Sequence, residues 1–512
     1  MISAISWIPK GAAKAEPAVA ELPSKEEIEE MIKSGALDKS EDNGSEDEDE
    51  NMDAEAEKQT GDVAQALAVA DALGKTSKNK SGSQLEDLTD GLKELDMDNY
   101  DDEDDGIELF SKGLGDLYYP GNEMDPYLKD EDDDDSEEIE DMTIRPMDSV
   151  IVCARTEDDV SHLEVCWDSI SKKNLDSKHA RHSLCSTSIQ VWIYEDSDEG
   201  DSNMYVHHDV IISAFPLCTA WLDCPLRGGE KGNFLAVGSM EPSIEIWDLD
   251  IIDEVQPCLV LGGTVVKKTK KGKKKSKYKD GSHTGAVLGL AWNKEYRNIL
   301  ASASADKQVK IWDVAAGKCN ITMEHHVGKV QAVAWNHHVP QVLLSGSFDR
   351  SVVMKDGRVP THSGFKWSVS AEVECLAWDP HTEYSFVVSL EDGTIRGYDI
   401  RAAKPDQSSE SKPSFTLHAH DKAACTISYN PAAPNLLATG SMDKTVKLWD
   451  LSNNQPSCIA SKNPKAGAIF SISFSQDNPF LLAIGGSKGK LGVWDTLSET
   501  AISGKFGNIA NS

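Results

Sequence analysis

The sequence predicts an all-β propeller that carries a long acidic insertion near its N-terminus. Two observations predict the propeller. Units of roughly 40 to 45 residues repeat with the same residue types at the same offsets, and each unit contains short apolar runs separated by turn residues. The charge distribution predicts the insertion. The net charge is −36, but residues 11–145 hold 44 acidic and 12 basic side chains, which leaves the remainder nearly neutral.

Residues 1–9 are predicted to form the first strand of the first blade. The segment ISAISWIPK places Trp7 where Trp292 stands in the repeat segment VLGLAW (287–292). The first blade otherwise lacks an innermost strand, and this segment has the sequence pattern to supply it. The alternative interpretation is a frayed terminus, which is common at the ends of domains.

Residues 10–146 are predicted to be an acidic, largely disordered insert between two strands of that blade. Runs such as SEDEDE and DEDDDDSEE repel themselves and contain few apolar residues. Such an insertion is tolerable because the entropy of loop closure grows only slowly with length. Ser45 and Ser136 precede carboxylates and are predicted phosphorylation sites for an acid-directed kinase. The insert is predicted either to bind basic partners such as histones or ribosomal proteins or to act as a solubilising spacer.

Residues 147–512 are predicted to form the propeller. HLEV (162–165) and WIYE (192–195) are interpreted as two halves of one strand, since together they match IEIWDLD (244–250). The polar stretch 166–191 is then an atypical insertion, either a bulging loop or an artefact of the sequence model.

Three repeats share a polar pattern without a gap. Each begins with His, continues with a hydroxyl and an Asp at constant offsets, and two of the three end in Trp. The residues are His283, Ser302, Asp306 and Trp312; His326, Ser345 and Asp349; and His420, Thr439, Asp443 and Trp449. Lys355 replaces the Trp in the second repeat. Weaker copies end at Trp247, Tyr398 and Trp494 and lack the His, so their blades are predicted to be less rigidly locked.

This pattern resembles the WD40 family, in which the four residues form a structural hydrogen-bonding tetrad. The resemblance implies a seven-bladed WD40 β-propeller. A catalytic role for His and Asp is the alternative, but buried polar networks commonly fix a fold. The chain also lacks HExxH, P-loop and GxGxxG motifs. We therefore expect no enzyme activity, no cofactor and no small-molecule substrate.

The segment 264–280 is predicted to be a lysine-rich loop. Its nine lysines are Lys267, Lys268, Lys270, Lys271, Lys273, Lys274, Lys275, Lys277 and Lys279. So dense a run predicts a nuclear-import signal or a patch that binds nucleic-acid phosphates. The alternative is a solvated loop.

The tetrapeptide YDIR (398–401) resembles a box by which some WD40 proteins bind the adaptor of cullin-type ubiquitin ligases. In that interpretation Asp399 and Arg401 contact the adaptor, and the protein is a substrate receptor.

Other residues favour no special site. The histidine pairs 207–208, 325–326 and 337–338 are predicted to be surface turn residues. The ten cysteines are scattered without metal-ligand spacing, which predicts a reducing compartment and no metal site. No apolar run approaches about 20 residues, so no membrane span is expected.

Longer stretches resemble one branch of the WD40 family, whose members are nucleolar. They include YVHHDVIISAFPLC (205–218), GNFLAVGSMEPSIEIWDLDI (232–251) and GSFDRSVVMKDGR (346–358). The resemblance implies a scaffold in ribosome biogenesis, in the nucleus and mainly the nucleolus, acting in pre-rRNA processing or rRNA transcription and in large-subunit assembly. Its implied partners are ribosome-assembly proteins, pre-rRNA and chromatin, with the chain a monomer inside larger complexes.

Overall fold

The computed structural model describes residues 1–20, 142–157, 186–195, 202–226, 228, 231–268, 274–359, 364–403 and 412–510. The chain divides into two compact units, Met1–Glu21 with Asp134–Ser512 and, separately, Leu22–Asp133. The second unit, together with Ser45 and the residues around Ser136, lies outside the described residues. Within the described part, no helix is both long and apolar enough to cross a membrane.

The first blade contains the N-terminal segment as its innermost strand. Its four strands, in spatial order, are β1 (Ile2–Ile8), β3 (Ser149–Glu157), β4 (Ser186–Glu195) and β5 (Asn203–Ile211). β1 pairs antiparallel with β3, so that Trp7 stands opposite Ile151. Two strands that are adjacent in space are therefore joined by the whole acidic segment of the sequence.

The prediction for the third strand of this blade is wrong in its first half. β4 is one unbroken strand from Ser186 to Glu195, so residues 186–191 belong to the strand and not to an interruption. Ile189, Val191 and Ile193 alternate along it and are buried, which provides the apolar face that a strand needs. The segment 162–165 lies outside the described residues.

The next five blades each have four antiparallel strands in chain order from the inside outward. Blade 2 consists of β6 (Pro216–Leu222), β7 (Phe234–Ser239), β8 (Ser243–Asp248) and β10 (Leu259–Gly262). Blade 3 consists of β13 (Val287–Trp292), β14 (Ile299–Ser304), β15 (Val309–Asp313) and β16 (Lys318–Met323). Blade 4 consists of β17 (Val330–Trp335), β18 (Val342–Ser347), β19 (Ser351–Asp356) and β20 (Phe365–Ser368). Blade 5 consists of β21 (Val373–Trp378), β22 (Ser385–Leu390), β23 (Thr394–Asp399) and β24 (Phe415–His418). Blade 6 consists of β25 (Thr426–Tyr429), β26 (Leu436–Gly440), β27 (Val446–Asp450) and β28 (Ser457–Lys462).

Blade 7 has three strands in the described part of the chain, β29 (Ile469–Phe474), β30 (Leu481–Gly486) and β31 (Leu491–Asp495). The short 3₁₀ helix η5 (Thr496–Ser498) and helix α6 (Thr500–Ala510) follow. Ile502 and Phe506 of α6 are buried in the apolar cluster that blades 6 and 7 share. Two further 3₁₀ turns, η3 (Ile400–Ala402) and η4 (Ser452–Asn454), follow the third strands of blades 5 and 6.

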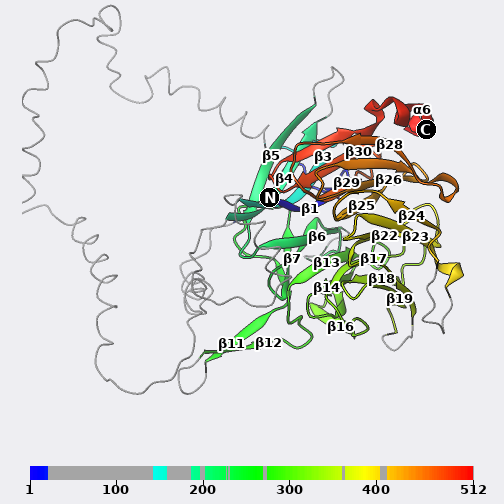
Figure 1. The fold of residues 1–512 in the computed structure, drawn as a ribbon. Coiled ribbons are helices and arrows are strands. Elements are labelled where there is room, and N and C mark those ends of the chain that lie inside the picture. The colour runs from blue at the N-terminus through cyan, green and yellow to red at the C-terminus, as the bar shows by residue number, and fades with distance from the viewer. Residues whose placement is uncertain are drawn as a thin grey trace, which may run out of the picture. The chain divides into compact units, whose positions relative to one another are not determined.

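The seven blades close into a ring, as predicted (Figure 1). Each inner strand contacts the inner strand of the next blade, and β1 contacts both β6 and β29. Ile2 and Ile5 pack with Leu481 and Ala483, which buries the seam between blades 1 and 7. A side chain at Gly485 would come within 2.5 Å of Ile2, so this seam is packed without spare room.

The described part of the lysine-rich segment forms strands, contrary to the predicted loop. β11 (Thr264–Lys268) pairs antiparallel with β12 (Lys274–Tyr278) beside blades 2 and 3, and we call this pair of strands the lysine hairpin (Figure 1). β-Branched residues and Tyr278 at its base favour strand over coil. A second small sheet pairs β2 (Ala18–Val19) in parallel with β9 (Ile251–Ile252), which holds the first described residues of the acidic segment against blade 2.

Candidate functional site

The inner strands of blades 3 to 7 end around a cavity of about 680 Å³. The turns that follow these strands form what we call the turn face of the ring. The acidic segment takes the place of the corresponding turn in blade 1, between β1 and β3. Lys10, just after β1, donates its backbone N–H to Asp477 in the turn of blade 7 at 2.8 Å. The start of the acidic segment, just after β1, is therefore held on the turn face.

Aromatic residues end the inner strands and link one blade to the next. The indole Nε1 of Trp335 donates to the carbonyl of Ala291 at 3.0 Å, and that of Trp378 donates to Ala334 at 3.1 Å. Trp7 makes the same bond across the seam of the ring, to Ser473 at 2.8 Å. A Trp that recurs at the end of the inner strand thus links neighbouring blades by a hydrogen bond.

The residue after the aromatic adds a second link. Asn293, Asn336 and Asn430 donate their side-chain amides to a backbone carbonyl in the turn of the next blade, at 2.6, 3.0 and 2.6 Å. Their side-chain oxygens accept N–H groups of their own turns. The turns of blades 3, 4 and 6 are consequently fixed both locally and to the next blade. The recurring sequence AWN at 291–293 and 334–336 was the signal that could have indicated these links.

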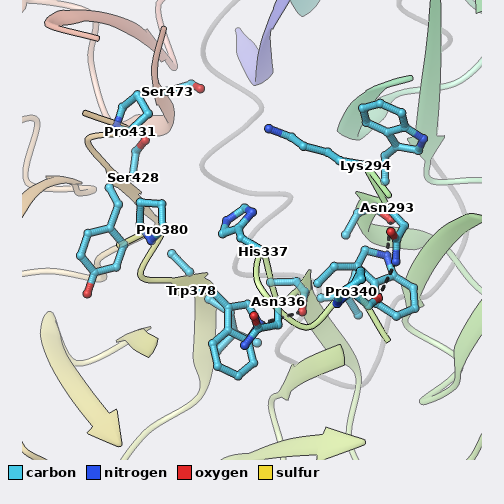
Figure 2. Close-up of a pocket in the computed structure, with 18 of the residues that line it drawn as sticks. Asn293, Lys294, Asn336, His337, Pro340, Trp378, Pro380, Ser428, Pro431 and Ser473 are labelled. Carbon is cyan, nitrogen blue, oxygen red and sulfur yellow. Dashed lines mark hydrogen bonds between the residues drawn. The ribbon is translucent and has the colours of Figure 1, made fainter. Parts of the chain in front are cut away.

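Lys294 and His337 are the basic side chains that line this cavity. Figure 2 shows both reaching toward its middle from neighbouring turns. Pro340, Pro380 and Pro431 stiffen its rim. Glu295 is the carboxylate among the lining residues. Burial lowers the pKa of both basic groups, that of His337 to about 4, so an acidic side chain that entered the cavity would meet Lys294 as its cationic neighbour.

The structure brings together the predicted tetrad residues of blades 3 and 6. In blade 3, His283 Nδ1 lies 2.8 Å from Asp306 Oδ2, and its Nε2 lies 2.7 Å from Ser302 Oγ. Trp312 Nε1 donates to the same hydroxyl at 2.8 Å. In blade 6 the bonds are His420 to Asp443 at 2.8 Å, His420 to Thr439 at 2.8 Å and Trp449 to Thr439 at 3.0 Å.

The electrostatics of these tetrads suit a structural role. Burial lowers the pKa of His283, and the bond to Asp306 only partly offsets this effect. Burial raises the pKa of Asp306, but hydrogen bonds from His283 and from backbone N–H groups outweigh it and bring the pKa to about 2. Asp306 is therefore charged and fully engaged, and His283 has no accessible face with which to act on a substrate.

Blade 4 completes its tetrad with a residue that the sequence pattern did not reveal. His326 bonds to Asp349 at 3.0 Å and to Ser345 at 2.9 Å. In place of the missing indole, Nε2 of His325 lies 2.8 Å from Ser345 Oγ. The prediction that the pair 325–326 is a surface turn is thus wrong, because His326 is buried and both rings serve the core.

Another histidine pair also departs from the prediction. His207 and His208 lie in β5, and their Nδ1 atoms are 2.8 Å apart. Nε2 of His207 bonds to the carbonyl of Met142 at 2.9 Å, at the end of the acidic segment. Burial, followed by the neighbouring His207, lowers the pKa of His208 to about 4. The pair 337–338 does lie in an exposed turn.

The predicted adaptor residues form an exposed ion pair on the outer part of blade 5. Arg401 Nη2 lies 2.6 Å from Asp399, and the guanidinium stacks on Tyr384 at 4.5 Å. Blade 4 carries the same arrangement, since Arg358 bonds to Asp356 at 2.7 Å. This second pair follows β19 as the first follows β23, and the sequence KDGR resembles YDIR closely enough to have been noticed.

The base of the lysine hairpin is anchored on the blade 3 tetrad. Gly263 donates its N–H to Ser282 Oγ at 2.9 Å, and Ser282 donates to the carbonyl of His283 at 2.8 Å. Lys277 and Lys279 are exposed, and the structure describes the backbone of Lys267, Lys268, Lys274 and Lys275 within the two strands. Lys270, Lys271 and Lys273 lie outside the described residues, as do Ser45 and Ser136. Among described residues, no group of three or more His, Cys, Asp or Glu could hold a metal ion.

Comparisons with known proteins agree with this architecture. The family model "WD domain, G-beta repeat" matches residues 274–313, 317–354 and 411–450. An uncharacterized WD repeat-containing protein of Schizosaccharomyces pombe is 40% identical over 82% of this chain and 77% of its own length. Periodic tryptophan protein 1 of Saccharomyces cerevisiae is 32% identical over 99% of this chain and 90% of its own length. A Drosophila melanogaster homolog of periodic tryptophan protein 1 is 26% identical over 73% of each chain.

Proposed function

The chain belongs to the periodic tryptophan protein 1 family of WD-repeat proteins, and from this premise we propose that it is a non-enzymatic assembly scaffold in ribosome biogenesis. It acts in the nucleus, mainly the nucleolus, on pre-rRNA processing or rRNA transcription and on large-subunit assembly. Its partners are ribosome-assembly proteins, together with pre-rRNA or chromatin. The observation that carries the proposal is similarity over 99% of the chain to the yeast protein, because the stretches that resemble this branch imply a nucleolar role.

The charge distribution supports a role in assembling unlike partners. Residues 11–145 concentrate the acidic charge and begin on the turn face, after β1. The nine lysines of the hairpin lie between β10 and β13, in another connection of the ring. Acidic chains attract basic proteins, and lysines bind phosphate backbones without reading the sequence. One closed ring can therefore hold a basic protein and an RNA at different places.

The proposal is tested by purifying the tagged full chain from its own cells and measuring pre-rRNA and ribosome-assembly proteins in the eluate. We expect both to be enriched and the tagged chain to be nucleolar. Replacement of the hairpin lysines by Gln should lower RNA recovery about tenfold and flatten its salt dependence. A control replaces the exposed Lys366, Lys422 and Lys444, which lie on blades away from the hairpin. Absence of pre-rRNA and of assembly proteins would contradict the scaffold role.

A second candidate function is a cullin-type ubiquitin-ligase substrate receptor. The observation that favours it is the repetition of the Asp–Arg pair on two neighbouring blades, at Asp356–Arg358 and Asp399–Arg401. Both arginine side chains are about two-thirds exposed, at 64% and 65%. Each therefore keeps donors that a docked adaptor could use.

This alternative predicts adaptor co-purification that depends on both arginines. Arg358→Ala combined with Arg401→Ala should abolish it, whereas Arg350→Ala, an exposed arginine in a different turn of blade 4, should not. If the double variant retains its adaptor, the pairs are not the docking site. If no adaptor is recovered with the unaltered chain, the receptor function is excluded.

A further inference from the structure

The outer edge of blade 7 differs from that of every other blade. Six blades have four hydrogen-bonded strands, whereas blade 7 has three in the part of the chain that the structure describes. β31 is therefore its outermost strand. β31 is followed by the 3₁₀ helix η5 and then by the helix α6, whose backbone groups bond within the helix and so cannot extend a β-ladder.

The register shows which backbone groups of β31 lack a strand neighbour. Thr496 donates its N–H to the carbonyl of Phe480 at 2.9 Å, so this pair exchanges hydrogen bonds. In an antiparallel ladder, residues whose backbone N–H and C=O groups bond to the neighbouring strand alternate with residues whose groups point away from it. The N–H and C=O groups of Leu491 and Val493 therefore point away from β30. At the equivalent place in blade 3, Ile311 pairs with Ile321 of β16.

The surroundings of β31 leave room for a fourth strand. A Cβ added at Gly492 would meet no atom within 4 Å. Gly492 and Val493 are half-buried, whereas Leu448, the blade 6 counterpart of Val493, is fully buried. α6 packs against β28 and η5 (Figure 1). An unpaired strand edge of this kind is a template for another chain.

The charges beside this edge indicate the chemistry of its occupant. Lys488 and Lys490 are exposed in the turn that leads into β31. Lys462 lies at the end of the neighbouring β28, with its Nζ 4.9 Å from the centre of the Trp494 ring. Asp495, at the far end of β31, is the acidic residue of the strand. Three lysines therefore flank the edge, and they favour an acidic segment.

We propose that the edge of β31 takes up an extended acidic segment of another polypeptide, which pairs antiparallel with Leu491 and Val493 and completes blade 7 as its fourth strand. In such strand addition the main-chain hydrogen bonds provide affinity and side-chain contacts provide selectivity. The lysines select against basic or neutral segments. This site is independent of the lysine hairpin and of the two Asp–Arg pairs.

Binding of defined peptides to the full chain tests the proposal. The probes are a synthetic peptide of about eight residues with alternating Val and Glu, and the same peptide with Lys in place of Glu. Fluorescence anisotropy should show the Glu peptide binding at least about tenfold more tightly than the Lys peptide. Equal affinity for the two, or no binding of either, would overturn the proposal.

Two variants locate the site. Val493→Pro removes an outward N–H that has no partner in the blade, and should weaken binding of the Glu peptide about tenfold or more. Val493→Thr keeps that N–H and should bind like the unaltered chain. Lys488→Glu with Lys490→Glu should weaken binding about tenfold, while Lys307→Glu, in the equivalent turn of the four-stranded blade 3, should not. Binding that none of the edge variants alters would place the peptide elsewhere.

Hydrogen exchange distinguishes the possible occupants. The amides of Leu491 and Val493 should exchange rapidly in the free full chain and become protected when the Glu peptide is bound. Protection in the free chain would overturn the proposal, because the edge would then already be covered by the chain itself or by a second copy.

Discussion

At the scale of single residues, Ser345 shows how one side chain substitutes for another. His326 uses its Nδ1 proton on Asp349, so its Nε2 accepts the hydroxyl proton of Ser345. His325 must then donate from Nε2 to Ser345, as the indoles of Trp312 and Trp449 do in their tetrads. Its Nδ1 is left buried without a partner. In this arrangement Ser345 donates to His326 and accepts from His325.

We predict that His325→Phe lowers the free energy of unfolding by about 1–2 kcal/mol, because Ser345 loses a donor in a buried network. His325→Gln, which retains a donor, should recover part of this loss. Urea unfolding measures both, with His337→Phe as the control because His337 lies in an exposed turn. Equal stability of the His325→Phe variant and the unaltered chain would contradict the proposed bond.

At the scale of the element, blade 5 shows a different way of locking strands together. Tyr398 stands at the Trp position, and Val388 replaces the tetrad hydroxyl. Phe386 stacks on Tyr398 at 5.4 Å and meets Trp367 edge-on at 5.1 Å. An aromatic cluster therefore occupies the place of a polar tetrad. The lower rigidity expected for this blade stays a prediction.

Strand β1 leads to a prediction about its own removal. Deletion of residues 1–9 removes the buried Ile2 and Ile5, the inner edge of blade 1 and the Trp7–Ser473 bond. Because buried isoleucines alone contribute about 2–5 kcal/mol each, we expect Tm to fall by at least about 10 °C. Differential scanning calorimetry measures this change.

The control for this deletion is a matched pair of single substitutions. Trp7→Phe removes a bond between blades, whereas Trp292→Phe removes a bond to Arg297 within its own blade. The first should be the more destabilising, since it also opens the seam of the ring. If deletion of residues 1–9 leaves Tm unchanged, the strand does not close the ring.

At the scale of the whole molecule, buried imidazoles in several blades make the ring sensitive to acid. Burial lowers the pKa of His208 to about 4 and of His325 to about 3. The unfolded chain binds protons at these residues near the ordinary value of 6.5. Below that pH the unfolded state binds more protons than the folded state, so stability is lost as pH falls.

We therefore predict that the free energy of unfolding decreases from pH 6.5 to about 4.5. Asp306 does not contribute in this range, because its pKa is lowered from 3.8 and its contribution is lost only at lower pH. Glu374 opposes the trend, since burial and then Glu391 raise its pKa to about 7. Glu374→Gln should thus steepen the decrease and His325→Phe should reduce it, as measured by urea unfolding across the range. A flat profile would contradict the assignment.

The sequence alone determined the strand repeats, the polar pattern of blades 3 and 6 and the place of residues 2–8. These features depend on contacts within one blade, where fixed offsets between residues reappear as fixed distances between atoms. A pattern written in residue types at constant spacing is therefore sufficient to recover them. It failed for β4 and for the lysine segment, where charged or polar residues concealed a strand that pairing with a neighbour stabilises.

The tertiary structure decided what lies between blades. The Trp335–Ala291 and Asn336–Glu383 bonds join residues more than 40 positions apart, at 44 and 47, and nothing in either local pattern names its partner. The role of His325 follows likewise from the absence of a Trp in blade 4, and the open edge of β31 from the absence of a fourth strand among the described residues. Local spacing can indicate a strand, but only the closed ring shows which of its hydrogen-bonding groups remain for another molecule.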